Sequence, residues 1–228
     1  MSTETRLVWD LPLRLFHWLF AASIFASWGA AKFDYMEIHL CLGYWMVGLL
    51  AFRIVWGFIG PRHARFSSFI AGPRTVLQYL KGMRGRTVQS VGHNPAGGLM
   101  VIIMLLLVAI QAATGLFATD DIIWTGPYNP AVSNATAERL TAIHHWNFNL
   151  ILAAIVLHLA AIGFYAAVKK HNLVISMLSG TKPATVVPDH EAISSSQLIK
   201  ALVVILISCA LVYWLLHAAP SPPPDALG

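Results

Sequence analysis

The sequence predicts an all-α integral membrane protein, a bundle of helices that cross a lipid bilayer. Of its 228 residues, 57% are hydrophobic and only 11% are charged, whereas soluble domains carry about 25% charged residues. The mean hydropathy is +0.65. Because so little charge cannot cover a water-facing surface, we expect lipid around the chain, and its eight Trp, eleven Phe and six Tyr fit aromatic belts at the membrane interfaces.

Five apolar runs are long enough to cross a bilayer, which takes roughly 20 residues. We expect spans over residues 13–31, 38–59, 95–118, 141–168 and 198–217. Asp10 and Pro12 favour a helix start at the first run. A cleaved signal peptide is the alternative there, but the aromatic content of the run and its His17 favour a span.

The charges between these runs predict the topology. The segment 61–91 has no acidic residue and carries six basic ones: Arg62, Arg65, Arg74, Lys81, Arg84 and Arg86. The segment 119–140 carries Asp120, Asp121 and Glu138 against a single Arg139. Because basic loops stay in the cytoplasm, we expect the N-terminus inside and, after five crossings, an extended Pro-rich tail (218–228) outside. Residues 75–83 favour a short helix in the membrane surface.

The net charge of +5 does not indicate nucleic-acid binding, because the basic residues flank apolar runs. Two cysteines, Cys41 and Cys209, lie inside apolar stretches and are typical of small hydrophobic packing residues. The sequence has no CxxCH motif, which excludes covalent haem attachment, and no CxxC pair, which would suggest zinc.

Four histidines fall within or at the edge of the expected spans, where ionisable residues indicate function. His17 lies near the inner end of the first span and His39 opens the second at the outer face. His144 and His158 lie fourteen residues apart on the fourth span, which on an α-helix is within about 40° of whole turns and a rise of about 21 Å. They therefore share one face, with His144 at the depth of His39 and His158 at the depth of His17.

Two histidine pairs, each from two helices, are typical of the axial ligands of b-type haem in a helical bundle. Zinc would need about four ligands at one depth. The sequence therefore predicts two non-covalent haems, the inner one held by His17 and His158 and the outer one by His39 and His144. His145 is an alternative outer ligand, although it lies about 100° around the helix from His144.

Two further residues are candidates for roles near the inner haem. Arg53 lies fourteen residues after His39 and so at the inner depth, where it is expected to pair with a haem propionate; snorkelling to the cytoplasmic face is the alternative. His93 opens the third span at the same face and is a candidate for a role with a quinone or a proton, with helix capping or plain exposure as the alternative.

At these residues the chain resembles the bacterial cytochrome b561 family and the related cytochrome b subunits of nickel–iron hydrogenases. The likeness spans residues 6–175. It rests on Val8-Trp9-Asp10-Leu11-Pro12, Arg14-Leu15-Phe16-His17-Trp18, His39-Leu40-Cys41-Leu42-Gly43, Arg53, Trp56-Gly57, Gly92-His93-Asn94-Pro95, His144 and His158.

The resemblance implies a four-helix membrane domain over residues 1–175 that binds two b haems and exchanges electrons with quinones in a bacterial inner membrane. Residues 176–228 then add a linker, a fifth span without an interior histidine, and the tail. The implied partners are quinone or quinol and a periplasmic redox protein, such as a c-type cytochrome or a dehydrogenase. A homo-oligomer is compatible with the sequence.

Three functions follow from this reading. The leading one is electron transfer between the quinone pool and an outer-face redox partner. A superoxide-to-quinone oxidoreductase uses the same haem arrangement and is the second. The third is a haem-free transporter or membrane anchor, in which the histidines pack or relay protons.

Overall fold

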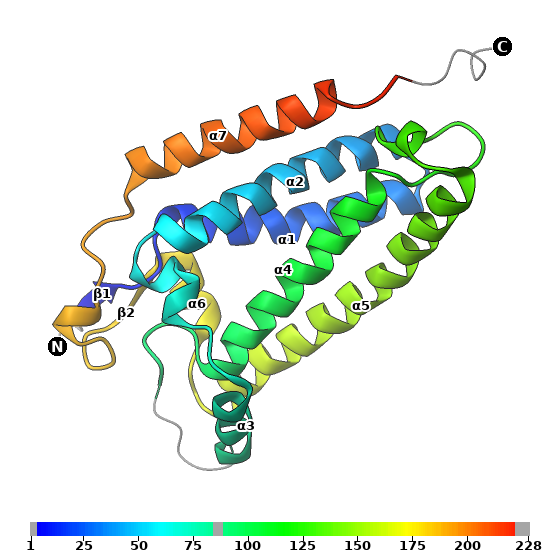
Figure 1. The fold of residues 1–228 in the computed structure, drawn as a ribbon. Helices are drawn as coiled ribbons and strands as arrows, with labels where there is room; N and C mark the ends of the chain where they lie inside the picture. Colours follow the sequence, from blue (N-terminus) through cyan, green and yellow to red (C-terminus); the bar gives the residue numbers. More distant parts are fainter. Residues whose placement is uncertain (1–3, 84–88, 222–228) are drawn as a thin grey trace. The chain divides into compact units, whose positions relative to one another are not determined.

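The computed structural model describes residues 4–83 and 89–221 of the chain. Figure 1 shows the described elements in chain order. The helices are α1 (Leu11–Lys32), α2 (Met36–Ile59), α3 (Pro73–Gly82), α4 (Pro95–Gly115), α5 (Asn134–Ala167), α6 (Leu173–Ser179) and α7 (Leu198–His217). Two short strands, β1 (Thr5–Leu7) and β2 (Thr181–Pro183), pair in antiparallel register. The predicted all-α class is thus confirmed, apart from this small ribbon.

Among the described residues, four helices are long and apolar enough to cross a membrane: α2, α4, α5 and α7. Helix α1 has 22 residues but is not one of these four, since Arg14, His17 and Lys32 lower its hydropathy. Many large apolar side chains on the long helices are exposed, such as Phe58 (68%) and Ile199 (84%), which would be unfavourable in water. A helical membrane bundle is therefore confirmed, while the predicted crossing by α1 stays a prediction.

Several helix bounds differ from the predicted spans. Helix α5 begins at Asn134 rather than at residue 141 because Ser133, whose side-chain oxygen accepts from the Thr136 N–H at 3.4 Å, starts the helix within the polar loop. Helix α4 ends at Gly115, before residue 118. Helix α6 crosses the predicted boundary at residue 175, and β2 and a 3₁₀ turn (Asp189–Glu191) are formed within the predicted linker. Arg84, Arg86 and residues 222–228 of the tail lie outside the described residues.

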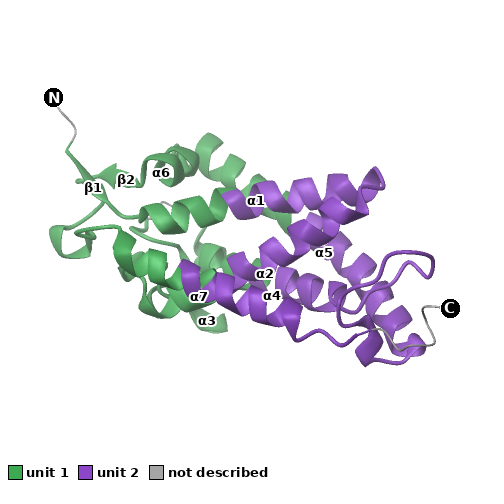
Figure 2. Ribbon diagram, turned by 90° about the horizontal axis from the view of Figure 1, so that it is seen from above, with its two compact units in different colours: residues 1–18, 52–104, 154–204 green, residues 19–51, 105–153, 205–228 purple. Residues whose placement is uncertain are grey.

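The chain divides into two compact units, coloured separately in Figure 2. The first unit contains residues 1–18, 52–104 and 154–204, and the second contains residues 19–51, 105–153 and 205–228. Each of the five long helices contributes a segment to each unit. The histidines of the predicted inner pair belong to the first unit and those of the predicted outer pair belong to the second.

The core of the first unit is built around Trp56, which is fully buried and stacks on Phe52 with ring centroids 5.6 Å apart. The Trp56 indole N–H donates to Oδ1 of Asp10 at 3.0 Å. The same oxygen accepts from the Leu13 backbone N–H at 2.9 Å, which confirms the predicted cap of the first helix. In this way the start of α1 is fixed against the end of α2.

Hydrogen bonds between helices also hold the second unit together. The Trp45 indole N–H donates to the Ser23 hydroxyl at 3.0 Å, and the Asn147 side-chain amide donates to the Leu107 carbonyl at 2.8 Å. Polar side chains of this kind bind apolar helices to one another, because lipid offers them no partner.

Candidate functional site

The second unit brings His39 of α2 and His144 of α5 together. Their imidazole rings are 6.1 Å apart between centroids and steeply inclined to each other, with planes at 80°. Both side chains are partly buried. His145, the alternative partner, is exposed, and its ring is paired with His144 at 6.2 Å rather than with His39. The structure therefore places His144 opposite His39, as the helical periodicity predicts.

Backbone carbonyls orient both rings of this pair. Nδ1 of His39 lies 2.9 Å from the Ser27 carbonyl, and Nδ1 of His144 lies 2.9 Å from the Gln111 carbonyl. A carbonyl only accepts hydrogen bonds, so each Nδ1 carries the proton and each Nε2 keeps a free lone pair. This is the arrangement in which a neutral histidine binds a metal through Nε2.

Gly115 makes room for the His144 ring. A side chain at this position would start 3.0 Å from Cε1 and 3.3 Å from Nδ1 of His144, closer than ordinary van der Waals contact. Even a methyl group here would push against the imidazole. The absence of a side chain at Gly115 thus allows the ring to lie against α4.

The first unit brings His17 of α1 and His158 of α5 together. Their ring centroids are 6.4 Å apart, with the planes at 55°. Nδ1 of His17 is enclosed and has no hydrogen-bond partner among the described residues. Trp18 packs edge-on against His17 at 4.9 Å. This pair therefore has nearly the ring separation of the His39–His144 pair, but Nδ1 of His17 is not held by a carbonyl among the described residues.

Arg53 lies inside the first unit, with only 2% of its surface exposed. Its guanidinium stands over the Phe66 ring at 4.7 Å, and the carboxylate of Asp10 attracts it electrostatically. One terminal nitrogen, Nη1, is buried and has no hydrogen-bond partner in the described part of the chain. A buried cation with an unused donor is a suitable partner for an anionic ligand group.

His93 precedes α4, and its ring packs between Trp9 and Phe69, with centroids 4.8 Å from each. Burial, reinforced by the positive charges of Arg53 and Lys182, lowers the pKa of His93 to about 3. Its Nδ1 is enclosed without a hydrogen-bond partner among the described residues. His93 is thus a neutral imidazole of intermediate exposure whose Nδ1 is enclosed.

Both pairs have the ring separation that two imidazoles bound to one iron would have. With metal–nitrogen bonds of about 2 Å, two opposed imidazoles place their ring centres about 6 Å apart. The observed separations are 6.1 and 6.4 Å. Among the described residues no group of three or more His, Cys, Asp or Glu side chains gathers as a metal site. The donor sets therefore fit a haem, whose ring supplies the remaining four ligands, better than a bare ion.

Three polar residues of the first unit are buried, which the sequence did not predict. Asp10 is fully buried, with Oδ2 lacking a partner in the described part of the chain. His63 is 5% exposed, and its Nε2–H donates to the Glu191 carbonyl at 2.8 Å. Lys182 is 3% exposed and donates to the carbonyls of Ser90 and Val91. Burial lowers its pKa to about 8.

Comparison with known proteins agrees with this geometry. The family model for prokaryotic cytochrome b561 matches residues 8–180, about three quarters of the chain. No curated protein and no solved structure matches it. The matched range includes both histidine pairs, Arg53 and His93, whereas α7 lies beyond it. The chain therefore belongs to the prokaryotic cytochrome b561 family, the membrane-bound b-type cytochromes of electron transfer.

Proposed function

We propose that the protein is a dihaem cytochrome that transfers electrons between the quinone pool and a redox partner at the outer face of the inner membrane. His17 and His158 ligate the inner haem, and His39 and His144 ligate the outer one. The observation that carries this proposal is the pair of imidazole separations, 6.4 and 6.1 Å, in a chain of this family. Residues 1–175 form the haem domain, to which 176–228 add α7.

The residues of each pair determine what chemistry the site performs. A bound haem iron supplies reversible one-electron chemistry between its ferric and ferrous forms. The two imidazoles of each pair would both bind the iron and leave it no open position, which favours electron transfer over the binding of a substrate to iron. The Ser27 and Gln111 carbonyls hold Nδ1–H of His39 and His144, so each Nε2 would be free to bind the iron without a change of tautomer.

Arg53 is proposed to pair with a propionate of the inner haem. Its 2% exposure supports this role over snorkelling, since a snorkelling side chain ends in water. The unpaired Nη1 supplies a donor for a carboxylate oxygen. The buried positive charge would also favour the reduced iron, which carries one positive charge less.

The proposed orientation places the N-terminus in the cytoplasm and the C-terminus in the periplasm. The basic segment 61–91 and the acidic segment 119–140 support it, because positive loops stay inside. Alkaline phosphatase fused after Gly228 should be active, and fused within residues 82–90 it should be inactive. An active enzyme at the second position would reverse the orientation.

The function is tested by reduction of the purified protein in lipid nanodiscs. Quinol should reduce both haems, seen as growth of the sharp α band, and an added periplasmic c-type cytochrome should reoxidise them. In a His158→Ala variant quinol should no longer reduce the outer haem. A protein without visible absorption would indicate a haem-free transporter or anchor. Reduction of the haems by superoxide but not by quinol would indicate that electrons flow from superoxide into the quinone pool.

A further inference from the structure

Helix α3 lies beside the C-terminal end of α5 (Figure 1). The Tyr79 and Tyr165 hydroxyls are hydrogen-bonded to each other, and the Asn94 side-chain amide donates to the Tyr165 hydroxyl at 3.0 Å. The ammonium group of Lys169, which follows α5, donates to the Met83 carbonyl at the end of α3 at 2.6 Å. These contacts hold α3 at the level of Tyr165.

The level of Tyr165 is that of the membrane–water interface at this end of α5. Helix α5 has 34 residues and is about 51 Å long, whereas the hydrocarbon core of a bilayer is about 30 Å thick. The ends of α5 therefore extend past the core. Tyr165 lies two residues before the helix ends, and Lys169 and Lys170 follow it. Tyrosine is enriched at membrane interfaces and lysine in the loops beyond them, so α3 lies among the lipid headgroups.

The exposed surface of α3 is divided between apolar and basic side chains. Counting around the helix from Tyr79, which contacts α5, Leu80 lies about 100° away and Leu77 about 160° away. Lys81 and Arg74 follow at about 200° and 220°. Leu77 is 54% exposed and Leu80 is 46% exposed. A helix in a membrane surface meets protein, acyl chains and phosphate groups in this same order.

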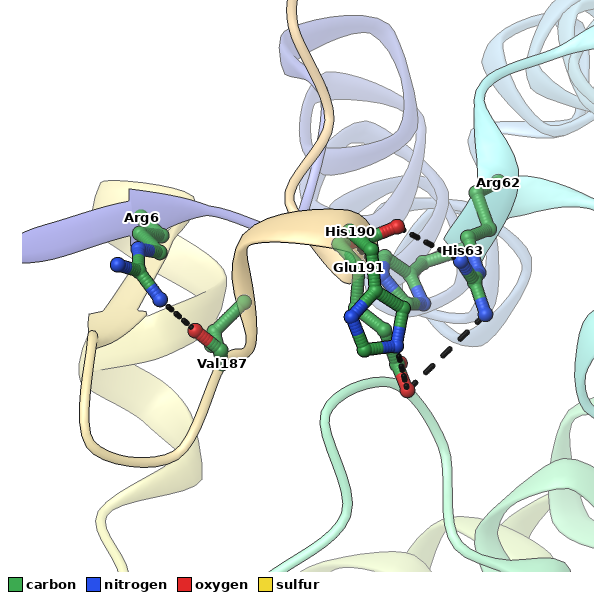
Figure 3. A network of polar contacts seen from close by, with 6 residues as sticks. All are labelled: Arg6, Arg62, His63, Val187, His190 and Glu191. Carbon is green, nitrogen blue, oxygen red and sulfur yellow. Dashed lines mark hydrogen bonds and ion pairs between the residues drawn. The ribbon is translucent and has the colours of Figure 1, made fainter.

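The two cations of this surface have no protein partner in the described part of the chain. Arg74 and Lys81 are seven residues apart, within about 20° of two full turns, so they lie along one line of the helix. Both are exposed, and neither forms an ion pair with a described residue. Arg62 differs, because it donates to the His190 carbonyl at 2.9 Å and lies 4.0 Å from the Glu191 carboxylate (Figure 3).

We propose that the exposed surface of α3 binds an anionic phospholipid, with the two cations at its phosphate group and the two leucines against its acyl chains. Charge complementarity favours this occupant, since the segment 61–91 contains no carboxylate that could neutralise Arg74 and Lys81. A zwitterionic lipid carries a cation of its own and offers them less. Lipid binding at α3 goes beyond the proposed electron transfer and does not depend on a haem.

Native mass spectrometry of the full chain in a neutral detergent tests this proposal, because it resolves each bound lipid and gives the dissociation constant of the first. Phosphatidylglycerol is the anionic probe and phosphatidylcholine the zwitterionic one. Arg74→Gln and Lys81→Gln each remove one exposed charge. Arg62→Gln is the matched control, because it removes the same charge from a residue that already has Glu191 as its partner.

We expect the wild type to bind phosphatidylglycerol roughly tenfold or more tightly than phosphatidylcholine. Each basic residue near an anionic lipid contributes about fivefold in affinity, so Arg74→Gln and Lys81→Gln should each weaken phosphatidylglycerol binding by about that factor. Neither should change phosphatidylcholine binding, and Arg62→Gln should match the wild type. Equal affinity of the wild type for both lipids, or equal weakening by Arg62→Gln, would overturn the proposal.

Two measurements on the wild type need no variant. Raising the ionic strength from about 0.1 M to about 1 M shortens the Debye length from about 10 Å to about 3 Å and should weaken phosphatidylglycerol binding but not phosphatidylcholine binding. An unchanged preference at high salt would contradict the role of the cations. Glycerol phosphate, which has the headgroup charge without acyl chains, should not displace the lipid at equal concentration. Displacement would identify a site for free phosphate esters and refute a lipid site.

Discussion

His39 and His144 face each other with their ring centres 6.1 Å apart, and backbone carbonyls hold the Nδ1 atoms of both. Two residues that are distant in the sequence are therefore brought together, each with its Nδ1 held by a carbonyl and its Nε2 left to bind a metal. The neighbouring His145 is exposed and takes no part in this pair. This difference between adjacent histidines supports His144, rather than His145, as the proposed outer ligand.

His144→Ala should remove the outer haem and retain the inner one, because it deletes one of two axial ligands. His145→Ala should retain both. Haem content per chain and the low-temperature α-band spectrum measure this directly, since the two sites are expected to absorb at slightly different wavelengths. If His145→Ala loses a haem and His144→Ala keeps both, His145 and not His144 is the outer ligand.

Gly115→Val should weaken haem binding at the outer site. The new side chain begins 3.0 Å from Cε1 of His144, and such overpacking costs about 1–3 kcal/mol, or roughly 5- to 150-fold in affinity. Haem titration of the apoprotein measures the change. Gly29→Val is the control, because a Cβ atom there meets nothing within 4 Å. Equal affinity in the two variants would show that the His144 ring does not depend on Gly115.

Arg53→Leu should lower the midpoint potential of the inner haem alone, because it removes a buried positive charge that favours the reduced iron. A tenfold weaker preference for the reduced form corresponds to about 60 mV for a one-electron couple. Optical redox titration of fully loaded protein measures both midpoints. Arg74→Leu removes an exposed positive charge instead and should leave both midpoints unchanged. Two unchanged midpoints in Arg53→Leu would mean that this residue does not face the haem.

Stability should fall as the pH drops from 7 to 5. The pKa of His93 is about 3 in the folded protein, against 6.5 as its ordinary value. Below pH 6.5 the unfolded chain therefore binds a proton that folded His93 does not bind, and the free energy of unfolding decreases by about 2 kcal/mol by pH 5. Thermal unfolding at both pH values measures this loss. His93→Phe should flatten the profile, whereas the profile of His190→Gln should match the wild type. Equal slopes in all three proteins would contradict a His93 that stays neutral in the folded protein.

The sequence predicts much of the fold, because lipid-facing helices need long apolar runs that are visible without a structure. The α2 and α7 bounds fall within two residues of the predicted ones. Helical periodicity and matched depth predict the pairing of His39 with His144. The order Asp10-Leu11-Pro12 predicts the cap at Asp10. Composition marks helix α1 less clearly as a span, since Arg14, His17 and Lys32 lower its hydropathy.

The sequence does not reveal the residues that complete the sites through tertiary contacts. His63 donates to a carbonyl 128 positions away, and Lys182 donates to carbonyls more than 90 positions away. Ser27 and Gln111 act through their backbone carbonyls, so their side-chain types carry no signal. These contacts depend on how segments distant in the sequence pack together, and no local sequence pattern predicts that packing. Residues such as Lys182 and His63 are recognised only in the structure, where their polar side chains are found to be buried.

The haem content of the purified protein tests the central claim most directly. Pyridine haemochrome absorbance, divided by the protein concentration from amino-acid analysis, gives the number of haems per chain, and acid–acetone extraction shows whether they are non-covalent. The two histidine pairs predict two extractable b haems per chain. A single haem in fully loaded material, or none, would contradict the assignment of one haem to each pair.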